Sequence, residues 1–168
     1  MSLESPKWIL ALPVVFCFHD LEELVFLDKI PSLSSTLPAN IRDLIQVSKP
    51  QFSTAISLLF IAILIITTQW YRKPSSPIRS AVMGFVVAGL FFNGLTHIGQ
   101  ALLFRQYVPG LVSAVVLLLP YTFVILRSQF RTFFPSNKTA VLVLLGVIAS
   151  TPVIVIGSLL FGRLLFPV

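Results

Sequence analysis

The stretch WILALPVVFCFHDLEELVFL, residues 8–27, decides how the rest of this chain is interpreted. Both ends of the stretch are apolar, and about 20 predominantly apolar residues suffice for a helix to cross a membrane. Its middle nevertheless carries His19, Asp20, Glu22 and Glu23, which include half of the six acidic residues of the chain. A charged side chain near the centre of a bilayer costs about 2.5–3.5 kcal/mol on insertion scales. A membrane span is therefore expected to contain such a cluster only if the charges are paired with other groups, bind a metal ion or take part in a reaction.

The composition of the whole chain indicates a polytopic membrane protein. Of its 168 residues 56% are hydrophobic and 11% are charged, and the mean hydropathy is +0.94. A soluble domain is about 25% charged. The apolar runs are long and continuous, whereas transmembrane strands would show alternating segments of about ten residues. We therefore expect a single membrane-embedded helical domain over residues 1–168.

Apolar runs separated by polar or proline-containing segments predict about five transmembrane helices in an all-α bundle. These runs cover residues 8–27, 51–71, 80–104, 111–126 and 139–166. Within the first long connection, residues 39–47 place Ile41, Leu44 and Ile45 at positions i, i+3 and i+4. This spacing predicts a short amphipathic helix at the membrane interface.

The distribution of lysine and arginine predicts the orientation and the partners. The net charge is +6, and the cations gather in the expected loops. Cytoplasmic loops carry an excess of lysine and arginine, so a cytoplasmic N-terminus is favoured. That side would hold Lys7, Arg72, Lys73, Arg79, Arg127, Arg131 and Lys138. No basic stripe with interleaved aromatic residues points to nucleic acid, and we expect the lipid bilayer and an apolar or lipid-like small molecule as partners.

The third apolar run contains a second set of polar residues. Asn93 and His97 are separated by four positions, and Gln100 follows three positions later. Residues at this spacing share one face of a helix. The run therefore predicts a polar row inside a transmembrane helix.

The first run offers a matching row, because His19, Glu22 and Glu23 also lie at i, i+3 and i+4. Consecutive spans alternate in direction, so the first and third spans are expected to be parallel. At a rise of 1.5 Å per residue, the two rows lie at the same depth to within about one helical turn. We therefore predict that the first and third spans pack together and that His97 lies beside Glu23, in one site that contains both histidines of the chain.

A metal ion is the first interpretation of this constellation. Imidazole and carboxylate ligands suit Zn, Fe and Mn, and two ligands at i, i+4 can reach one ion. The candidate ligands are His19, Glu22, Glu23 and His97.

Two other interpretations involve no bound metal. Glu22 and Glu23 could share a proton away from water and act as a general acid, with Asn93 as a further catalytic group. The cluster could instead form a proton or ion relay in a carrier. For a single Asn or Gln, a hydrogen bond that merely joins two helices is the simpler explanation, but it does not explain three acids and two histidines at one depth.

The run HDLEE at residues 19–23 resembles the motif of the HXXEE family of small integral membrane proteins. That family's pattern also includes a later asparagine and histidine, which are similar to Asn93 and His97, and a turn like YVPG at residues 107–110. The resemblance covers nearly the whole chain and implies a metal-binding or enzymatic role without naming a reaction. A similarity to small membrane carotenoid and terpenoid cyclases is limited to the acidic pair.

These observations favour a membrane-embedded enzyme that acts on a lipid or isoprenoid-like substrate through a His/Glu site. The expected reaction class is an isomerisation, cyclisation or hydrolysis, assisted by a metal or by acid–base catalysis. The alternative is an ion or proton carrier, or a metal-binding membrane module without chemistry. Carriers commonly contain two structural repeats with broken helices, and five spans do not divide into two equal halves.

Overall fold

A computed structural model describes residues 6–29 and 48–165, and all regular structure within them is helical. Along the chain the elements are η1 (Lys7–Ala11), α1 (Leu12–Val25), η2 (Leu27–Lys29), α4 (Lys49–Arg72), α5 (Pro77–Phe104), α6 (Leu111–Ser113), the π-helical η3 (Ala114–Leu118), α7 (Leu119–Phe133) and α8 (Asn137–Leu165). The prediction of an all-α bundle is confirmed. The interfacial helix predicted at residues 39–47 lies outside the described residues.

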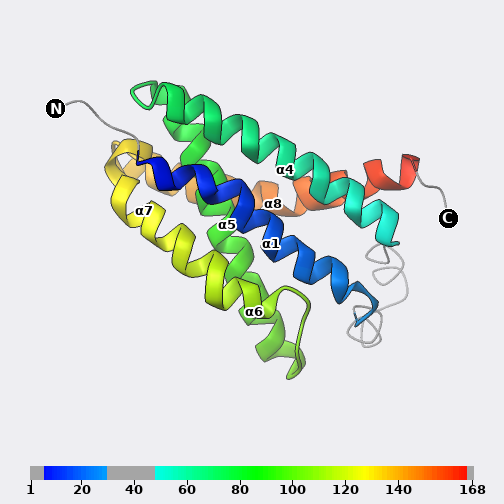
Figure 1. Cartoon of the computed structure of the whole chain (residues 1–168). Coiled ribbons are helices and arrows are strands. Elements are labelled where there is room, and N and C mark those ends of the chain that lie inside the picture. Colours follow the sequence, from blue (N-terminus) through cyan, green and yellow to red (C-terminus); the bar gives the residue numbers. More distant parts are fainter. Residues whose placement is uncertain (1–5, 30–47, 166–168) are drawn as a thin grey trace.

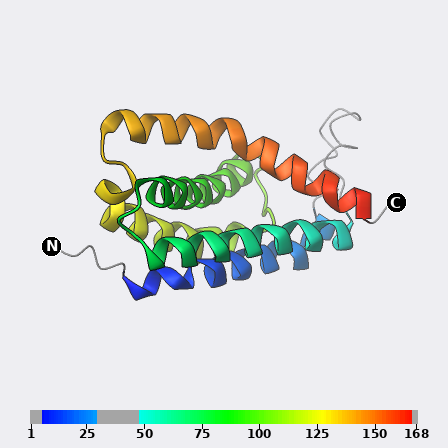
Figure 2. The same ribbon diagram turned by 90° about the horizontal axis from the view of Figure 1, so that it is seen from above.

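The long helices run back and forth between two ends of the bundle (Figures 1 and 2). One end, here called the N-terminal end, holds the start of η1 and the turns that join α4 to α5 and α7 to α8. The opposite end holds the end of α1 and the turn at residues 105–110 between α5 and α6. The end of α1 and the end of α5 therefore lie at the same end of the bundle, although about 80 residues separate them in the sequence.

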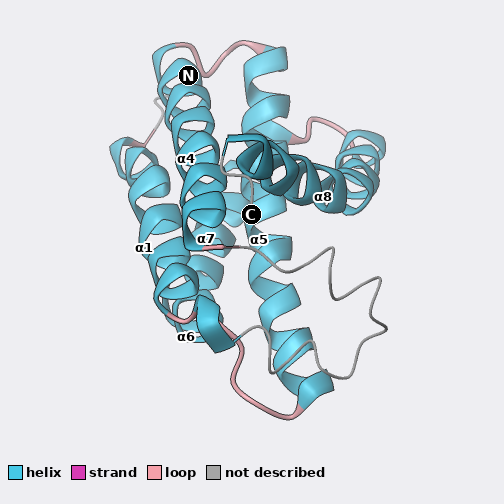
Figure 3. Ribbon diagram, turned by 90° about the vertical axis from the view of Figure 1, so that its right-hand side faces the viewer, coloured by secondary structure: helices cyan, strands magenta, loops and turns pink. Residues whose placement is uncertain are grey.

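The helices pack in a definite order around the core. The helix α1 lies mainly against α4 and η3, whereas α5 lies mainly against α7 and α8. Figure 3 shows α8 on the side of α5 away from α1. At the N-terminal end, the fully buried Trp70 donates from Nε1 to Ser80 Oγ at 3.1 Å, and its ring meets Phe133 edge to face. Ser80 in turn donates to the Pro74 carbonyl at 2.8 Å, which fixes the α4–α5 turn.

Three of the helices are long and apolar enough to cross a membrane by length and composition. They are α4, α5 and the continuous run of α6, η3 and α7 at Leu111–Phe133. Five spans were predicted. Within the described residues, three helices meet the criterion of length and composition. The first predicted span falls short because it begins as the 3₁₀ helix η1, and α1 is only 14 residues long. Pro13 lies in the first turn of α1, where a proline without an N–H is tolerated best.

The outer surface of the bundle is strongly apolar. On α1, Val14, Phe18, Leu21 and Val25 recur at helical spacing and are all exposed. The opposite face of the same helix is buried and carries His19 at 0% exposure. An exposed apolar stripe of this kind is typical of a surface that faces lipid, and it places the polar residues of α1 toward the interior of the bundle.

Two glycines of α5 allow close contact with α7. A Cβ atom at Gly84 would lie 2.7 Å from Phe133 Cβ, and one at Gly94 would lie 2.8 Å from Leu119 Cγ. Gly89 lies on the same helix, but a Cβ atom there would meet nothing within 4 Å. Gly84 and Gly94, on the face of α5 that contacts α7, therefore set how closely these two helices approach.

We expect Gly84→Ala to destabilise the bundle, although alanine is the better helix former. Overpacking costs about 1–3 kcal/mol, and the Phe133 Cβ atom cannot move without moving its backbone. Thermal unfolding in detergent should show a lower Tm, by about 2–4 °C for each kcal/mol lost. Gly89→Ala is the matched control and should unfold at or above the wild-type temperature. Equal Tm values for the two variants would contradict the packing described here.

Candidate functional site

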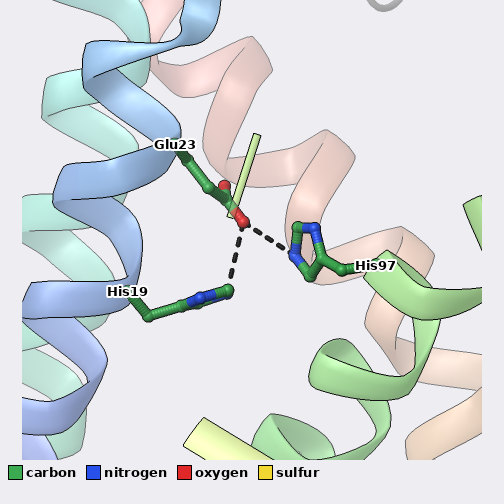
Figure 4. A group of neighbouring side chains, drawn as sticks. All are labelled: His19, Glu23 and His97. Atoms are coloured by element: carbon green, nitrogen blue, oxygen red, sulfur yellow. Dashed lines mark ion pairs between the residues drawn. The ribbon is translucent and has the colours of Figure 1, made fainter. Parts of the chain in front are cut away.

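Two histidines converge on one carboxylate, and these three side chains are here called the His/Glu site (Figure 4). Glu23 Oε1 lies 3.3 Å from His19 Nε2 and 2.8 Å from His97 Nε2. The imidazole rings are edge to face, with centroids 4.9 Å apart. Both histidines are buried, and the Glu23 side chain is 18% exposed. The prediction that His97 lies beside Glu23, in a site containing both histidines, is confirmed.

The site lies close to one end of the bundle. His19 precedes the last residue of α1 by six positions, and His97 precedes the last residue of α5 by seven. At 1.5 Å per residue these positions are about 9 Å and about 10 Å from the helix ends, so the predicted depth match holds. The prediction that the polar row lies at mid-span is corrected, because α1 ends at Val25 and Glu23 falls in its last turn.

Long side chains bridge the gap between α1 and α5. The main packing partners of α1 are α4 and η3, and those of α5 are α7 and α8. The predicted pairing of the first and third spans therefore takes place mainly through the side chains of the site. The i, i+4 spacing of His19 and Glu23 brings both to one face of α1, where they can reach His97.

The turn at residues 105–110 lies directly against the site. Gly110 has φ +83°, a left-handed conformation that favours glycine. A Cβ atom there would lie 2.9 Å from Glu23 Oε1 and 2.9 Å from His97 Cε1. Gly110 thus has two reasons to be glycine, the backbone conformation and the close approach to the site.

Glu22 points to the start of α6 and is not one of the three converging residues. Its Oε2 accepts from the Ser113 N–H at 2.6 Å, and its Oε1 accepts from the Val112 N–H at 3.2 Å and the Tyr107 hydroxyl at 2.6 Å. Burial raises the pKa of the Tyr107 phenol above its usual value, and the hydrogen bond to Glu22 adds a smaller contribution in the same direction. The Tyr107 hydroxyl therefore keeps its proton and donates a hydrogen bond to Glu22. The carboxylate therefore holds the 105–110 turn and the helix after it in place.

Ser113 connects this anchor to the first histidine. Its hydroxyl lies 3.0 Å from His19 Nδ1 and 3.3 Å from the Gly110 carbonyl oxygen. A carbonyl only accepts, so the hydroxyl donates to Gly110 and accepts the His19 Nδ1–H. In the neutral ring, Nε2 is then the acceptor, and Asn93 Nδ2 donates to it at 3.2 Å. Ser113 thus fixes the ring form in which Nε2 carries the lone pair, and in this structure that lone pair accepts from Asn93.

The remaining polar residues of the two rows take other positions. Asp20 is buried, but its Oδ2 has no hydrogen-bond partner among the described residues. His97 Nδ1 likewise has no partner there. Gln100 is exposed and lies outside the site.

Sequence reasoning did not identify Ser113 as part of the site. Ser113 lies in an apolar run, and its role depends on the turn that returns α6 to the side of α1. The sequence did indicate this turn through Pro109 and Gly110. Tyr107 entered the sequence analysis only as the first residue of the YVPG turn, with no role at the site. What the sequence lacks is any signal that the turn faces Glu22 and Glu23.

Apolar helices of membrane-spanning length, with a buried His/Glu group at one end, suggest a small helical membrane protein with an ionisable site. A family model described as "Protein of unknown function with HXXEE motif" matches residues 10–125. The chain belongs to this family. The matched residues contain the whole His/Glu site, Glu22 and Ser113, and they exclude α8. Comparisons with curated proteins and with solved structures find no match.

We expect Gly110→Ala to disturb the site and to lower stability. The left-handed backbone costs a non-glycine residue about 1–2 kcal/mol, and the added Cβ must displace Glu23 or His97. Thermal unfolding should show a lower Tm, and the ¹⁵N NMR signals of both imidazoles should shift. Gly99→Ala is the control, because a Cβ atom there meets nothing within 4 Å. Unchanged imidazole signals in Gly110→Ala would show that the turn does not touch the site.

Proposed function

We propose that His19, Glu23 and His97 bind one divalent transition metal ion, and that the protein is a membrane-embedded enzyme acting on a lipid or isoprenoid-like substrate. The observation that carries this proposal is the convergence of two imidazoles and one carboxylate, whose ligand atoms all lie within 4.8 Å of one another. Two histidines with one carboxylate form the ligand set of several catalytic zinc sites and of non-haem iron sites. Zn, Fe and Mn are the candidate ions.

The donor atoms fit a single small ion. Zn–N and Zn–O distances of about 2.0–2.2 Å put neighbouring ligand atoms of a tetrahedral site about 3.3–3.5 Å apart. The His19 Nε2 to Glu23 Oε1 distance is 3.3 Å, and the His97 Nε2 to Glu23 Oε1 distance is 2.8 Å. A slight outward movement of one side chain brings the second distance into the same range.

The hydrogen bonds around His19 also favour a cation at the centre. Ser113 accepts the Nδ1–H, which is how a metal-ligating histidine is commonly held by its second nitrogen. The Nε2 atom, which then carries no proton, lies 3.3 Å from a carboxylate oxygen of Glu23. Two electron-rich atoms at this distance repel each other unless a cation lies between them. A metal ion satisfies this requirement, and so does a proton on His19.

The chemistry supplied by such an ion when bound is Lewis-acid polarisation of an oxygen or activation of water. The chain itself orients the ligands: Ser113 holds His19 through Nδ1, and Glu22 holds the turn over the site. Asn93, which donates to His19 Nε2 in this structure, would give up that hydrogen bond when Nε2 binds an ion. Asn93 is the uncharged polar group next to the ligands and is proposed to orient substrate. Glu22 was also predicted as a ligand and a catalytic acid, and its three hydrogen bonds support a positioning role instead.

An apolar substrate fits the surroundings of the site. Exposed apolar side chains lie on the outer face of α1, including Leu21 and Val25, and at the end of α5, including Leu102 and Leu103. The ligands themselves are shielded, with only Glu23 in part exposed. A lipid-like molecule could therefore lie along the apolar surface with its reactive group at Glu23.

Metal analysis of the purified protein tests the ligand set. After loading with Zn²⁺, Mn²⁺ or Fe²⁺ and removal of excess metal, we expect about one tightly held ion per chain for at least one of them. His19→Ala, Glu23→Gln and His97→Ala should each lose it, since two ligands hold an ion much less tightly than three. Glu22→Gln is the matched control and should keep the ion while unfolding at a lower temperature. Loss of metal in Glu22→Gln alone would reverse the assignment of the two glutamates.

Turnover of lipids tests the enzymatic part. The protein, reconstituted in nanodiscs that contain glycerophospholipids and a long-chain isoprenoid alcohol, should convert one component over time, as detected by mass spectrometry. Chelation and Glu23→Gln should both stop the conversion. Metal movement across proteoliposome membranes that Glu23→Gln abolishes, without any lipid conversion, would instead establish a carrier.

A further inference from the structure

The N-terminal end of the bundle carries a concentration of positive charge. Six of its basic side chains are exposed and one is half-buried. They come from η1, from both sides of the α4–α5 turn and from both sides of the α7–α8 turn, which Figure 2 shows together at one end. These residues are Lys7, Arg72, Lys73, Arg79, Arg127, Arg131 and Lys138, here called the basic end.

No acidic side chain accompanies the basic end among residues 6–29 and 48–165. The four acidic residues in these ranges all lie in the second half of α1 or in η2, toward the opposite end; they are Asp20, Glu22, Glu23 and Asp28. The opposite end has Lys29, Lys49 and Arg105, together with Arg163 near the end of α8, and Lys49 is paired with Asp28 at 2.7 Å. The two ends of the molecule therefore differ strongly in charge.

We propose that the basic end binds the phosphate headgroups of an anionic membrane leaflet. Lysine and arginine next to a membrane-spanning helix are attracted to anionic lipids, and they gather on the cytoplasmic side of membrane proteins. On α7, Arg131 lies in the last turn and Arg127 about one turn further inside the helix. Their long side chains can extend along the helix to the headgroups. Arg79 instead donates to the Gln69 carbonyl oxygen at 2.9 Å, which ties the start of α5 to the end of α4.

This arrangement also fixes the side of the membrane on which the His/Glu site opens. The site lies about 9–10 Å from the helix ends at the opposite end of the bundle. With the basic end on the cytoplasmic leaflet, the turn at residues 105–110 faces the other side. The substrate of the proposed enzyme is then drawn from the non-cytoplasmic leaflet, and this second part rests on the function proposed above.

Cysteine labelling tests the orientation. Cys17 is the only cysteine, so Cys17→Ser gives a background for single-cysteine variants. Ser75→Cys reports the basic end and Gln106→Cys the turn over the site, since both positions are exposed. In spheroplasts treated with a membrane-impermeant maleimide, Gln106→Cys should be labelled and Ser75→Cys should be labelled only after permeabilisation. The reverse pattern would overturn the proposal.

Lipid retention tests the headgroup contact itself. Native mass spectrometry of protein purified from mixed phosphatidylglycerol and phosphatidylcholine should show preferential retention of phosphatidylglycerol. Replacing Arg72, Lys73, Arg127 and Arg131 by Gln should lower that preference at least threefold. The control, with Lys29→Gln and Arg105→Gln at the opposite end, should keep it. If both variants lowered the preference for phosphatidylglycerol equally, the lipid would be held by general charge attraction, and the proposal that it binds at the basic end would be rejected.

The metal content of the same samples separates this proposal from the proposed function. The four-Gln variant should keep its metal ion, because none of its changes touches the His/Glu site, and retained metal also shows that the variant is folded. Loss of lipid preference with metal retained supports the basic end alone. An unchanged lipid preference rejects the basic end whatever the metal content.

Discussion

A carboxylate removed from water must be paired, and the pairing of Glu23 determines much of this structure. Its Oε1 meets both imidazoles of the chain, one from α1 and one from α5, and the Gly110 backbone lies against it. The charge of a carboxylate buried without partners would cost several kcal/mol. The pairing therefore requires α1 and the end of α5 to face each other, although their main packing partners are other helices.

The two adjacent glutamates of the motif perform different tasks because they point about 100° apart on the helix. Glu23 faces the histidines, whereas Glu22 accepts hydrogen bonds from the Tyr107 hydroxyl in the 105–110 turn and from the Val112 and Ser113 N–H groups that follow it. Ser113 joins the two, since its N–H is bound by Glu22 and its hydroxyl by His19. Glu22 thus holds the segment that surrounds Glu23. Substitution of Glu23 is expected to remove a group of the site itself, whereas substitution of Glu22 is expected to release the turn beside it.

The bundle combines a polar interior at one end with an apolar exterior. The exposed stripe of α1 lies on the face opposite to His19, so the same helix meets both environments. At the other end, aromatic packing of Trp70 on Phe133 and the hydrogen bond to Ser80 close the core without ionisable groups. Among residues 6–29 and 48–165, the buried histidines and Asp20 lie in the second half of α1 and toward the end of α5, and this grouping makes that region the candidate site.

The sequence alone determined the helical class, the family and the pairing of His97 with Glu23, because helical spacing and depth follow directly from residue numbers. Of the five membrane-spanning helices predicted, three meet the length and composition criterion within the described residues, and the first run does not, since it divides into η1 and the 14-residue α1. It also assigned Glu22 the same ligand and catalytic roles as Glu23 and did not find Ser113. These assignments depend on where the turn after α5 places Gly110 and the start of α6, and such a contact between distant segments leaves no local pattern. Only the tertiary structure decided that Glu22 holds the turn and stands outside the group formed by Glu23 and the two histidines.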